Sequence, residues 1–139
     1  MVRVLAVADE VCDALWGAKA AALAPDVVLA AGDLPWGYLE FLASVTDRPV
    51  VFVPGNHDPA VASARQHRSG QFRPHVGIDA LHPLLERLHP RWHLHGHVHP
   101  YGQPRPDRRV GDTTIRNVIP YRMFEIPHVR DRGPEEGPR

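Results

Sequence analysis

The chain lacks several features that direct proteins to particular classes. Its single cysteine, Cys12, cannot form a disulfide within the chain, which favours a reducing compartment. No apolar segment approaches the roughly 20 residues that a membrane-spanning helix needs. The 16 basic residues are balanced by 16 acidic ones, so no overall field attracts nucleic acid or an anionic membrane. These absences predict a soluble, cytoplasmic protein for which neither a membrane nor a nucleic acid is an implied partner.

The length of 139 residues sets the number of domains. One domain with its own core is expected, although the chain is short for two packed sheets. The N-terminal residues 1–5 read directly as a first strand, because they lack the apolar region and cleavage site of a signal peptide. Residues 128–139 are rich in glycine, proline and charge and are expected to form a disordered tail. We therefore expect the domain to span residues 1–127.

The first half of the chain alternates short apolar runs with stretches of helix-forming residues. The apolar runs are rich in β-branched residues and too short for buried helices, which favours strands. Alternation of this kind predicts a parallel sheet with crossover helices. The expected strands are residues 2–8, 27–31 and 50–53, and the expected helices are residues 11–23 and 37–44.

The second half has a less regular pattern. Residues 59–77 are polar and show no clear period, whereas the leucines within residues 78–88 have helical spacing. Residues 107–109 read as a surface turn. Strands are expected at residues 92–95, 113–119 and 122–126, and a turn at Pro120 joins the last two.

Residues that bind metals follow four of the expected strands. Asp9 and Asp33 each follow an apolar run, and the motifs at residues 55–58 and 96–99 set histidines beside a glycine. In a parallel sheet the carboxyl ends of the strands converge on one crevice, so these side chains should lie close together. Mixed oxygen and nitrogen ligands suit one or two divalent metals.

These motifs resemble the signature of the calcineurin-like metallophosphoesterase superfamily. The signature runs Asp-x-His, Gly-Asp, Gly-Asn-His-Asp/Glu, a lone His and Gly-His-x-His, each on a loop after a strand. The Gly-Asp element at Asp33 and the motifs at 55–58 and 96–99 match fully, but the first element matches only at Asp9, because Val11 replaces its histidine. The resemblance implies an α/β fold, a metallophosphoesterase-like sandwich of mixed, mainly parallel sheet flanked by helices. Few residues separate the two histidine motifs, so we expect this sandwich to be reduced in size.

The resemblance also implies a metal-dependent phosphoric ester hydrolase whose nucleophile is a hydroxide bridging two divalent ions. Residues 90–97, followed by Tyr101, look like the small phosphodiesterase-like branch, so a diester is preferred over a monoester as the small phosphate-ester substrate. Manganese, iron or zinc would suit the ligands. The implied metal ligands are Asp9, Asp33, Asn56, His97, His99 and, as the lone histidine, His67 or alternatively His75.

The resemblance also implies a role for each of these ligands except the lone histidine. Asp33 would bridge both ions, because a carboxylate has two oxygens and each can bind one ion. Asp9 and His99 would hold the first ion. Asn56 and His97 would hold the second.

Further histidines are expected near the metals without binding them. By resemblance, His57 donates a proton to the leaving oxygen of the ester, and Asp58 orients its imidazole ring. His93 and His95 alternate along a strand and therefore point to one face. There they either support the second histidine motif or form a half-buried polar surface.

The departure at Val11 weakens the first metal site. Valine has no donor atom, so this ion should bind weakly and respond to added manganese unless Glu10 or Asp13 supplies a ligand. The same departure, together with the shortened middle, supports an alternative: a degenerate, weakly active or inactive homologue that acts as a metal-binding or interaction module. Apolar surface left uncovered by the shortening would favour a homo-oligomer.

Overall fold

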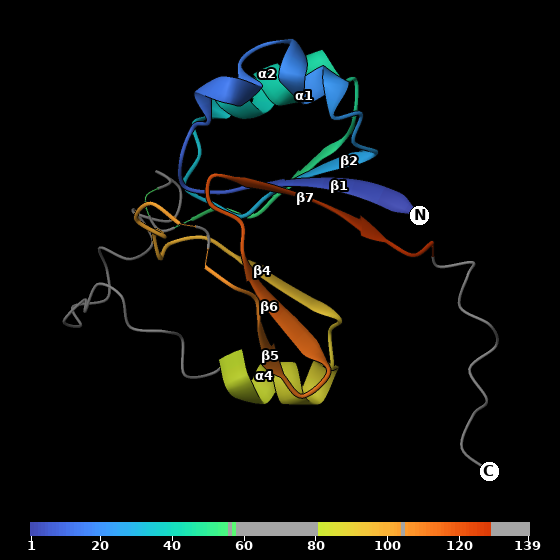
Figure 1. The fold of residues 1–139 in the computed structure, drawn as a ribbon, viewed down its shortest axis with the longest axis vertical. Coiled ribbons are helices and arrows are strands. Elements are labelled where there is room, and N and C mark those ends of the chain that lie inside the picture. The colour runs from blue at the N-terminus through green and yellow to red at the C-terminus, as the bar shows by residue number, and fades with distance from the viewer. Residues whose placement is uncertain (56, 58–80, 104, 129–139) are drawn as a thin grey trace.

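The computed structural model describes residues 1–55, 57, 81–103 and 105–128. The described elements form four layers, with helices on one side, two sheets in the middle and another helix on the far side (Figure 1). The reduced α/β sandwich expected from the motifs is thereby confirmed. The irregular stretch at 59–77 and the tail from residue 129 onward lie outside the described residues.

The first sheet consists of β1 (Val2–Val7), β2 (Val27–Ala30), β3 (Val50–Phe52) and β7 (Tyr121–Ile126). Its strand order is β3-β2-β1-β7. Parallel pairing joins β1 to β2 and β2 to β3, whereas β7 returns antiparallel to β1. This parallel core follows from the alternation of strands and helices in the first half of the chain.

The second sheet consists of β4 (Trp92–His95), β5 (Arg108–Val110) and β6 (Thr113–Asn117). Here β4 runs parallel to β6, and β5 pairs antiparallel with the other side of β6. Among the described strands, parallel pairs outnumber antiparallel ones, as expected. The connection at Pro120, which follows a cis peptide bond, leads from β6 to β7 and therefore links the two sheets, not two neighbouring strands.

Three α-helices of the described chain flank the sheets, namely α1 (Ala18–Ala22), α2 (Trp36–Thr46) and α4 (Leu81–Leu88). The prediction of a single helix at residues 11–23 was wrong. The chain first makes a 3₁₀ turn, η1 (Asp13–Leu15), and α1 begins only after Gly17, whose extended backbone (φ −143°, ψ −155°) interrupts any helix. Trp16 packs at this break against Tyr38 and Phe41 of α2, with ring centroids 5.3 and 4.5 Å apart.

The surface turn expected at residues 107–109 was also wrong, because Arg108 begins β5. Asp107, just before this strand, accepts a hydrogen bond from Nε of Arg116 on β6 at 3.0 Å. This bond with the Arg116 guanidinium lowers the pKa of the Asp107 carboxyl. A three-residue edge strand made mostly of exposed arginine shows no apolar alternation, so its sequence does not identify it.

Apolar side chains fill the space on both sides of β1. Leu5 joins the cluster beneath the helices together with Leu42, and both are fully buried. Ala6 and Ala8 point the other way, into a cluster that includes Val118 from the segment after β6. Each buried leucine contributes roughly 1.5–3 kcal/mol to stability. Because Ala6 of β1 and Ala8 just after it are small, the second sheet can pack closely on the first here.

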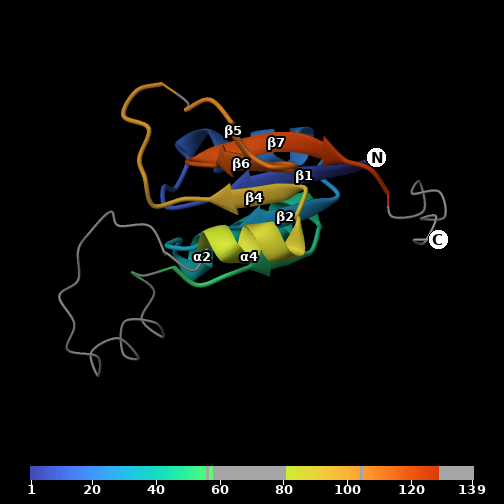
Figure 2. The ribbon, with the colours of Figure 1, turned by 90° about the horizontal axis from the view of Figure 1, so that it is seen from below.

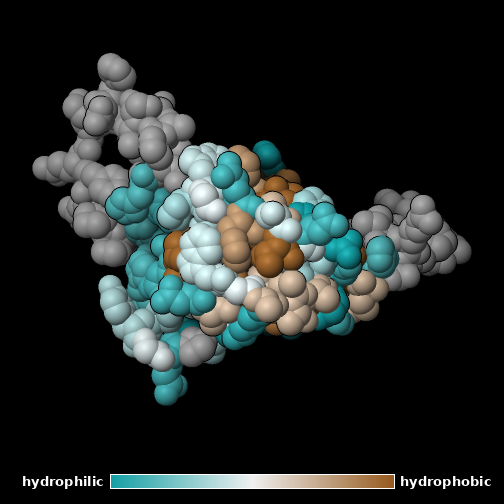
Figure 3. Space-filling view, turned by 90° about the horizontal axis from the view of Figure 1, so that it is seen from above, coloured by the Kyte–Doolittle hydropathy of each residue, from teal (hydrophilic) through white to brown (hydrophobic). Residues whose placement is uncertain are grey.

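The surface carries apolar side chains in two regions. On the helical face seen from above, apolar residues lie near the middle and hydrophilic ones surround them (Figure 3). On β3, Val51 and Phe52 are 56% and 47% exposed. The homo-oligomer, in which a second copy of the chain would cover such a surface, stays a prediction. Within the described residues, no helix has the length and apolar character needed to cross a membrane.

Candidate metal centre

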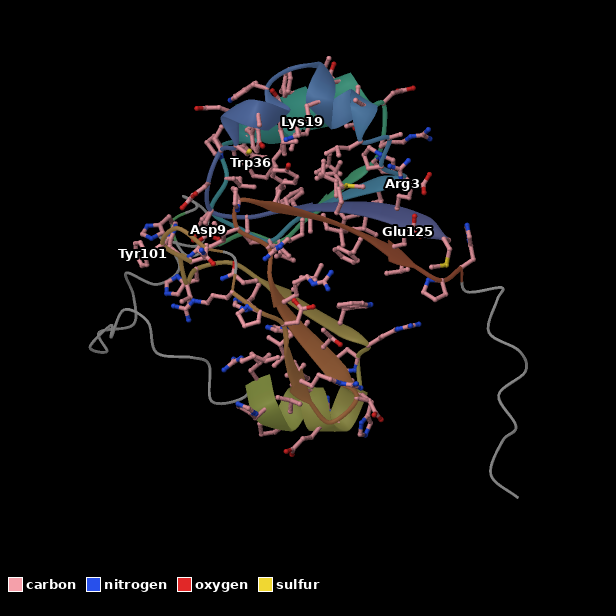
Figure 4. All side chains as sticks on the ribbon, viewed as in Figure 1. Arg3, Asp9, Lys19, Trp36, Tyr101 and Glu125 are labelled. Atoms are coloured by element: carbon pink, nitrogen blue, oxygen red, sulfur yellow. The ribbon has the colours of Figure 1, made fainter. Side chains whose placement is uncertain are left out.

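Three strand ends bring the centre together. Asp9 follows β1, Asp33 follows β2 and His97 follows β4, and Figure 2 shows β1 and β4 ending at the same edge. Figure 4 places Asp9 at this edge, near Tyr101. One potential ligand atom from each of Asp9, Asp33 and His97 lies within 4.8 Å of the other two. In the described part of the chain, these three side chains form the group that could hold a metal ion.

All three residues adopt a backbone conformation that side chains other than glycine rarely take. Their φ angles are +58° at Asp9, +57° at Asp33 and +65° at His97. Two of them lie at the centre of γ-turns, since Glu10 donates its N–H to the Ala8 carbonyl at 2.6 Å and Val98 donates to Gly96 at 2.8 Å. Such conformations cost on the order of 1–3 kcal/mol each and concentrate at functional sites. The strain therefore marks the same residues as the ligand chemistry.

Two glycines leave room for the two carboxylates. A Cβ placed on Gly96 would lie 1.8 Å from Oδ2 of Asp9, and one on Gly55 would lie 2.1 Å from Oδ1 of Asp33. A histidine one residue after Gly96 and another two residues after Gly55 hold the same carboxylates by backbone hydrogen bonds. His97 donates its N–H to Oδ1 of Asp9 at 2.8 Å, and His57 donates to Oδ1 of Asp33 at 2.7 Å. Each glycine-histidine loop thus folds around one carboxylate.

The electrostatic environment disfavours a bare pair of carboxylates. Burial raises the pKa of the Asp9 carboxyl above its ordinary value of 3.8, the His97 N–H opposes this rise, and the charge of Asp33 adds to it. A divalent cation among the three side chains would compensate both negative charges. Carboxylate and imidazole donors suit manganese, iron and zinc, so the residues present fit the metals that the motifs imply.

His99, expected as a ligand, is not brought into this group. Its Nδ1 lies 2.5 Å from Oε1 of Glu10, and both side chains are partly exposed, at 36% and 49%. Val11, at the position of the missing histidine, is 37% exposed. Glu10, directly before it, pairs with His99, whereas Asp13 lies exposed in η1.

Most of the remaining candidate site residues lie outside the part of the chain that the structure describes. Asn56, Asp58, His67 and the alternative His75 lie outside the described residues, so their roles stay predictions. The side chain of His57 is exposed beside Asp33.

The histidines of β4 share one face, as expected from the strand period. The rings of His93 and His95 stack with centroids 5.8 Å apart. Burial, followed by the charge of His95, lowers the pKa of His93. The Nδ1 of His95 also lies 3.0 Å from the Gly96 carbonyl oxygen. The face is thus half-buried and adjoins the second histidine motif.

Cys12 and Asn117 are two further residues outside the candidate ligand set. Cys12 is partly buried and packs against the cluster beneath the helices. Asn117 was missed: this buried residue at the end of β6 donates from Nδ2 to the Val98 carbonyl at 2.6 Å. Asn117 continues the inward-facing positions of Thr113 and Ile115 on the same strand. A polar residue at such a position was the sequence signal that could have identified it.

Replacing Gly96 with alanine tests the close approach around Asp9. Because the added Cβ would clash with the carboxylate, we expect Gly96→Ala to weaken Mn²⁺ binding at least ~10-fold while most of the core persists. Titration calorimetry measures the affinity. Gly37→Ala is the matched control, since a Cβ there meets nothing within 4 Å in α2 and alanine favours helices. Unchanged affinity in Gly96→Ala would show that the loop does not depend on this contact.

The raised pKa of Asp9 predicts a pH dependence of the metal-free protein. The folded state holds the Asp9 proton more tightly than the unfolded chain, so stability falls as pH rises from below 3.8 through the folded pKa. Asp9→Asn has the same shape and no charge. Without metal it should therefore melt at a higher temperature than the native chain at neutral pH, and the difference should shrink in acid. Thermal melts of both proteins from acid to neutral pH measure this difference. A lower melting temperature for Asp9→Asn than for the native chain at neutral pH would contradict the raised pKa of Asp9.

Known structures share this arrangement of sheets. Two crystal structures of Vps29 from Entamoeba histolytica, a single mutant and a double mutant, are similar to the chain with TM-scores of 0.52 and 0.56. Sequence identity is 17% and 16%, and in both cases the match covers 84% of this chain and 73% of the other. Likeness at this identity shows the fold alone.

Sequence comparison identifies the family. No curated protein matches the chain. A family profile described as calcineurin-like phosphoesterase matches residues 5–76, which include Asp9, Asp33 and the first histidine motif. This match covers more than half of the 139 residues. With its motifs, its sandwich and this match, the chain belongs to the calcineurin-like phosphoesterase family.

Proposed function

We propose that this protein is a metal-dependent phosphoric ester hydrolase. The observation that carries the proposal is the convergence of Asp9, Asp33 and His97, whose potential ligand atoms lie within 4.8 Å of one another. These residues occupy the ligand positions of the family's motifs, and each has a strained backbone. The family match supports a phosphoesterase activity of this general kind.

The chain's own residues would hold the metals as follows. Asp9, Asp33 and His97 would hold the metal, with Oδ1 of Asp33 fixed by the His57 N–H and Oδ1 of Asp9 fixed by the His97 N–H. Asn56 and His67 complete the proposal by resemblance. When bound, divalent ions supply charge that stabilises the phosphoryl transition state and lower the pKa of water toward neutrality. We propose manganese, because the two aspartates favour a harder ion.

His57 is proposed as the proton donor to the leaving oxygen. Its backbone N–H is bound to Asp33, so its exposed imidazole starts from the rim of the centre, where a substrate could reach it. A proton delivered there stabilises the departing alkoxide. Asp58, the next residue, would orient the ring. The substrate proposed is a small phosphodiester, and a monoester is the nearest alternative.

One observation favours a second candidate function. His99 is paired with Glu10 outside the three-residue group, and Val11 offers no ligand. A chain with these features could bind a single metal ion, or none, and act as an interaction module. Counting bound ions and measuring hydrolysis on the same sample separates the two functions.

The proposed function predicts metal binding and hydrolysis together. Purified protein incubated with Mn²⁺ should hold it after desalting and hydrolyse bis(p-nitrophenyl) phosphate. Asp33→Ala and His97→Ala should each lower metal affinity and hydrolysis by at least ~100-fold, because each change removes a direct ligand. Asp112→Ala and His82→Ala, at exposed positions away from the centre, are matched controls. Metal binding without any hydrolysis would support the interaction module instead.

Removing the His57 imidazole should separate proton donation from metal binding. His57→Ala should keep its metal and lose roughly 10²–10⁴-fold in rate on esters with poor leaving groups, the usual scale for a lost general acid. Nitrophenyl esters, whose leaving group needs no proton, should suffer much less. Rates on alkyl and nitrophenyl diesters measure this contrast. Equal losses on both would rule out His57 as the donor.

A further inference from the structure

Asn117 is a buried polar residue on β6, the central strand of the second sheet. It ends β6 and is only 6% exposed. In the described chain, Thr113 at the other end of the same strand is the other buried polar residue. Burying an amide is unfavourable unless its donors and acceptor find partners, so both atoms of this side chain call for an explanation.

Both ends of the Asn117 amide are used. Its Nδ2 donates to the Val98 carbonyl oxygen at 2.6 Å, and its Oδ1 accepts the N–H of Ile119 at 2.9 Å. The first bond reaches the loop that carries His97. The second fixes the start of the connection from β6 to β7. One side chain thus joins the metal-centre loop to the passage between the two sheets.

This bond completes the support of a strained turn. His97 is the central residue of a γ-turn with φ +65°, closed by the N–H of Val98 on the Gly96 carbonyl. Before the turn, Val118 donates to the carbonyl of His95 at 3.0 Å. Within it, the His97 N–H is held by Asp9. After it, the Val98 carbonyl is held by Asn117, so the turn is fixed on both sides.

We propose that Asn117 is the positioning residue for His97, a role that rests on the proposed function. By holding the Val98 carbonyl, it keeps the turn in its strained conformation and the imidazole beside Asp9 and Asp33. Asparagine suits this position because its amide donates and accepts at once. Aspartate has the same shape and can still accept from Ile119, but its carboxylate would face the Val98 carbonyl without a donor.

The matching change at the other end of β6 provides a control. Thr113 is 2% exposed and donates from Oγ1 to the Pro90 carbonyl at 2.6 Å. Thr113→Val keeps the shape and removes this one buried hydrogen bond, far along the strand from the metal-centre loop. It should destabilise the fold without changing the position of His97.

The test measures the loop with and without metal. In metal-free protein, amide hydrogen exchange followed by NMR should show the His97 and Val98 amides of Asn117→Asp opening about 10-fold more often than in the native chain, the scale of one lost buried hydrogen bond. Calorimetry should show Mn²⁺ affinity falling about 10-fold. Thr113→Val should change neither. Asn117→Ser, whose shorter side chain cannot span to Val98, gives the same test if the aspartate variant does not fold.

The outcomes separate this inference from the proposed function. Native exchange rates and native affinity in a destabilised Asn117 variant would overturn the positioning role, as would equal losses in Thr113→Val. If the native chain binds no Mn²⁺ while exchange in the loop still rises selectively, the proposed function fails and Asn117 stands as the clamp of the turn.

Discussion

Two half-buried carboxylates, Asp9 and Asp33, lie together at the site, where burial raises the pKa of Asp9 and the negative charge of Asp33 raises it further. Each carboxylate receives a backbone N–H from a glycine-histidine loop, at 2.8 Å from His97 and 2.7 Å from His57. Any side chain at Gly96 would prevent this approach. These hydrogen bonds reduce the repulsion without removing it, and a bound cation would complete the compensation. The chemistry of such a site therefore rests on a backbone arrangement as much as on a set of ligands.

This arrangement needs both sheets at once. Asp9 follows β1 in the first sheet, whereas His97 follows β4 in the second, so the centre exists only when the sandwich closes. Closure depends on Ala6 and Ala8 facing the second sheet, because larger side chains would hold the sheets apart. The positive φ angles at the three candidate ligands destabilise the fold further, and the burial of the strands must offset this free energy. A short chain can support the site because every part of it lies at one edge of the sheets.

Sequence reasoning predicted the strands and the motifs well, because both are local patterns of apolar residues, glycine and histidine. It failed where the outcome depends on contacts between distant residues. The pairing of Glu10 with His99 leaves no mark in the surrounding sequence. The alternation along β6 could have marked Asn117 as an inward-facing polar residue, but not its bond to Val98. The polar edge strand β5 was missed for the same reason, since it is identified only by pairing with β6. The helix broken at Gly17 shows that helix propensity alone does not set helix length.

The most direct test of the account is a crystal structure of the protein grown with Mn²⁺, with anomalous diffraction measured to locate the metal. The account predicts an anomalous peak among the carboxylates of Asp9 and Asp33 and the imidazole of His97, with both glycine-histidine loops in place. A peak held by His99 and Glu10 alone, or no peak at the ends of β1, β2 and β4, would contradict it.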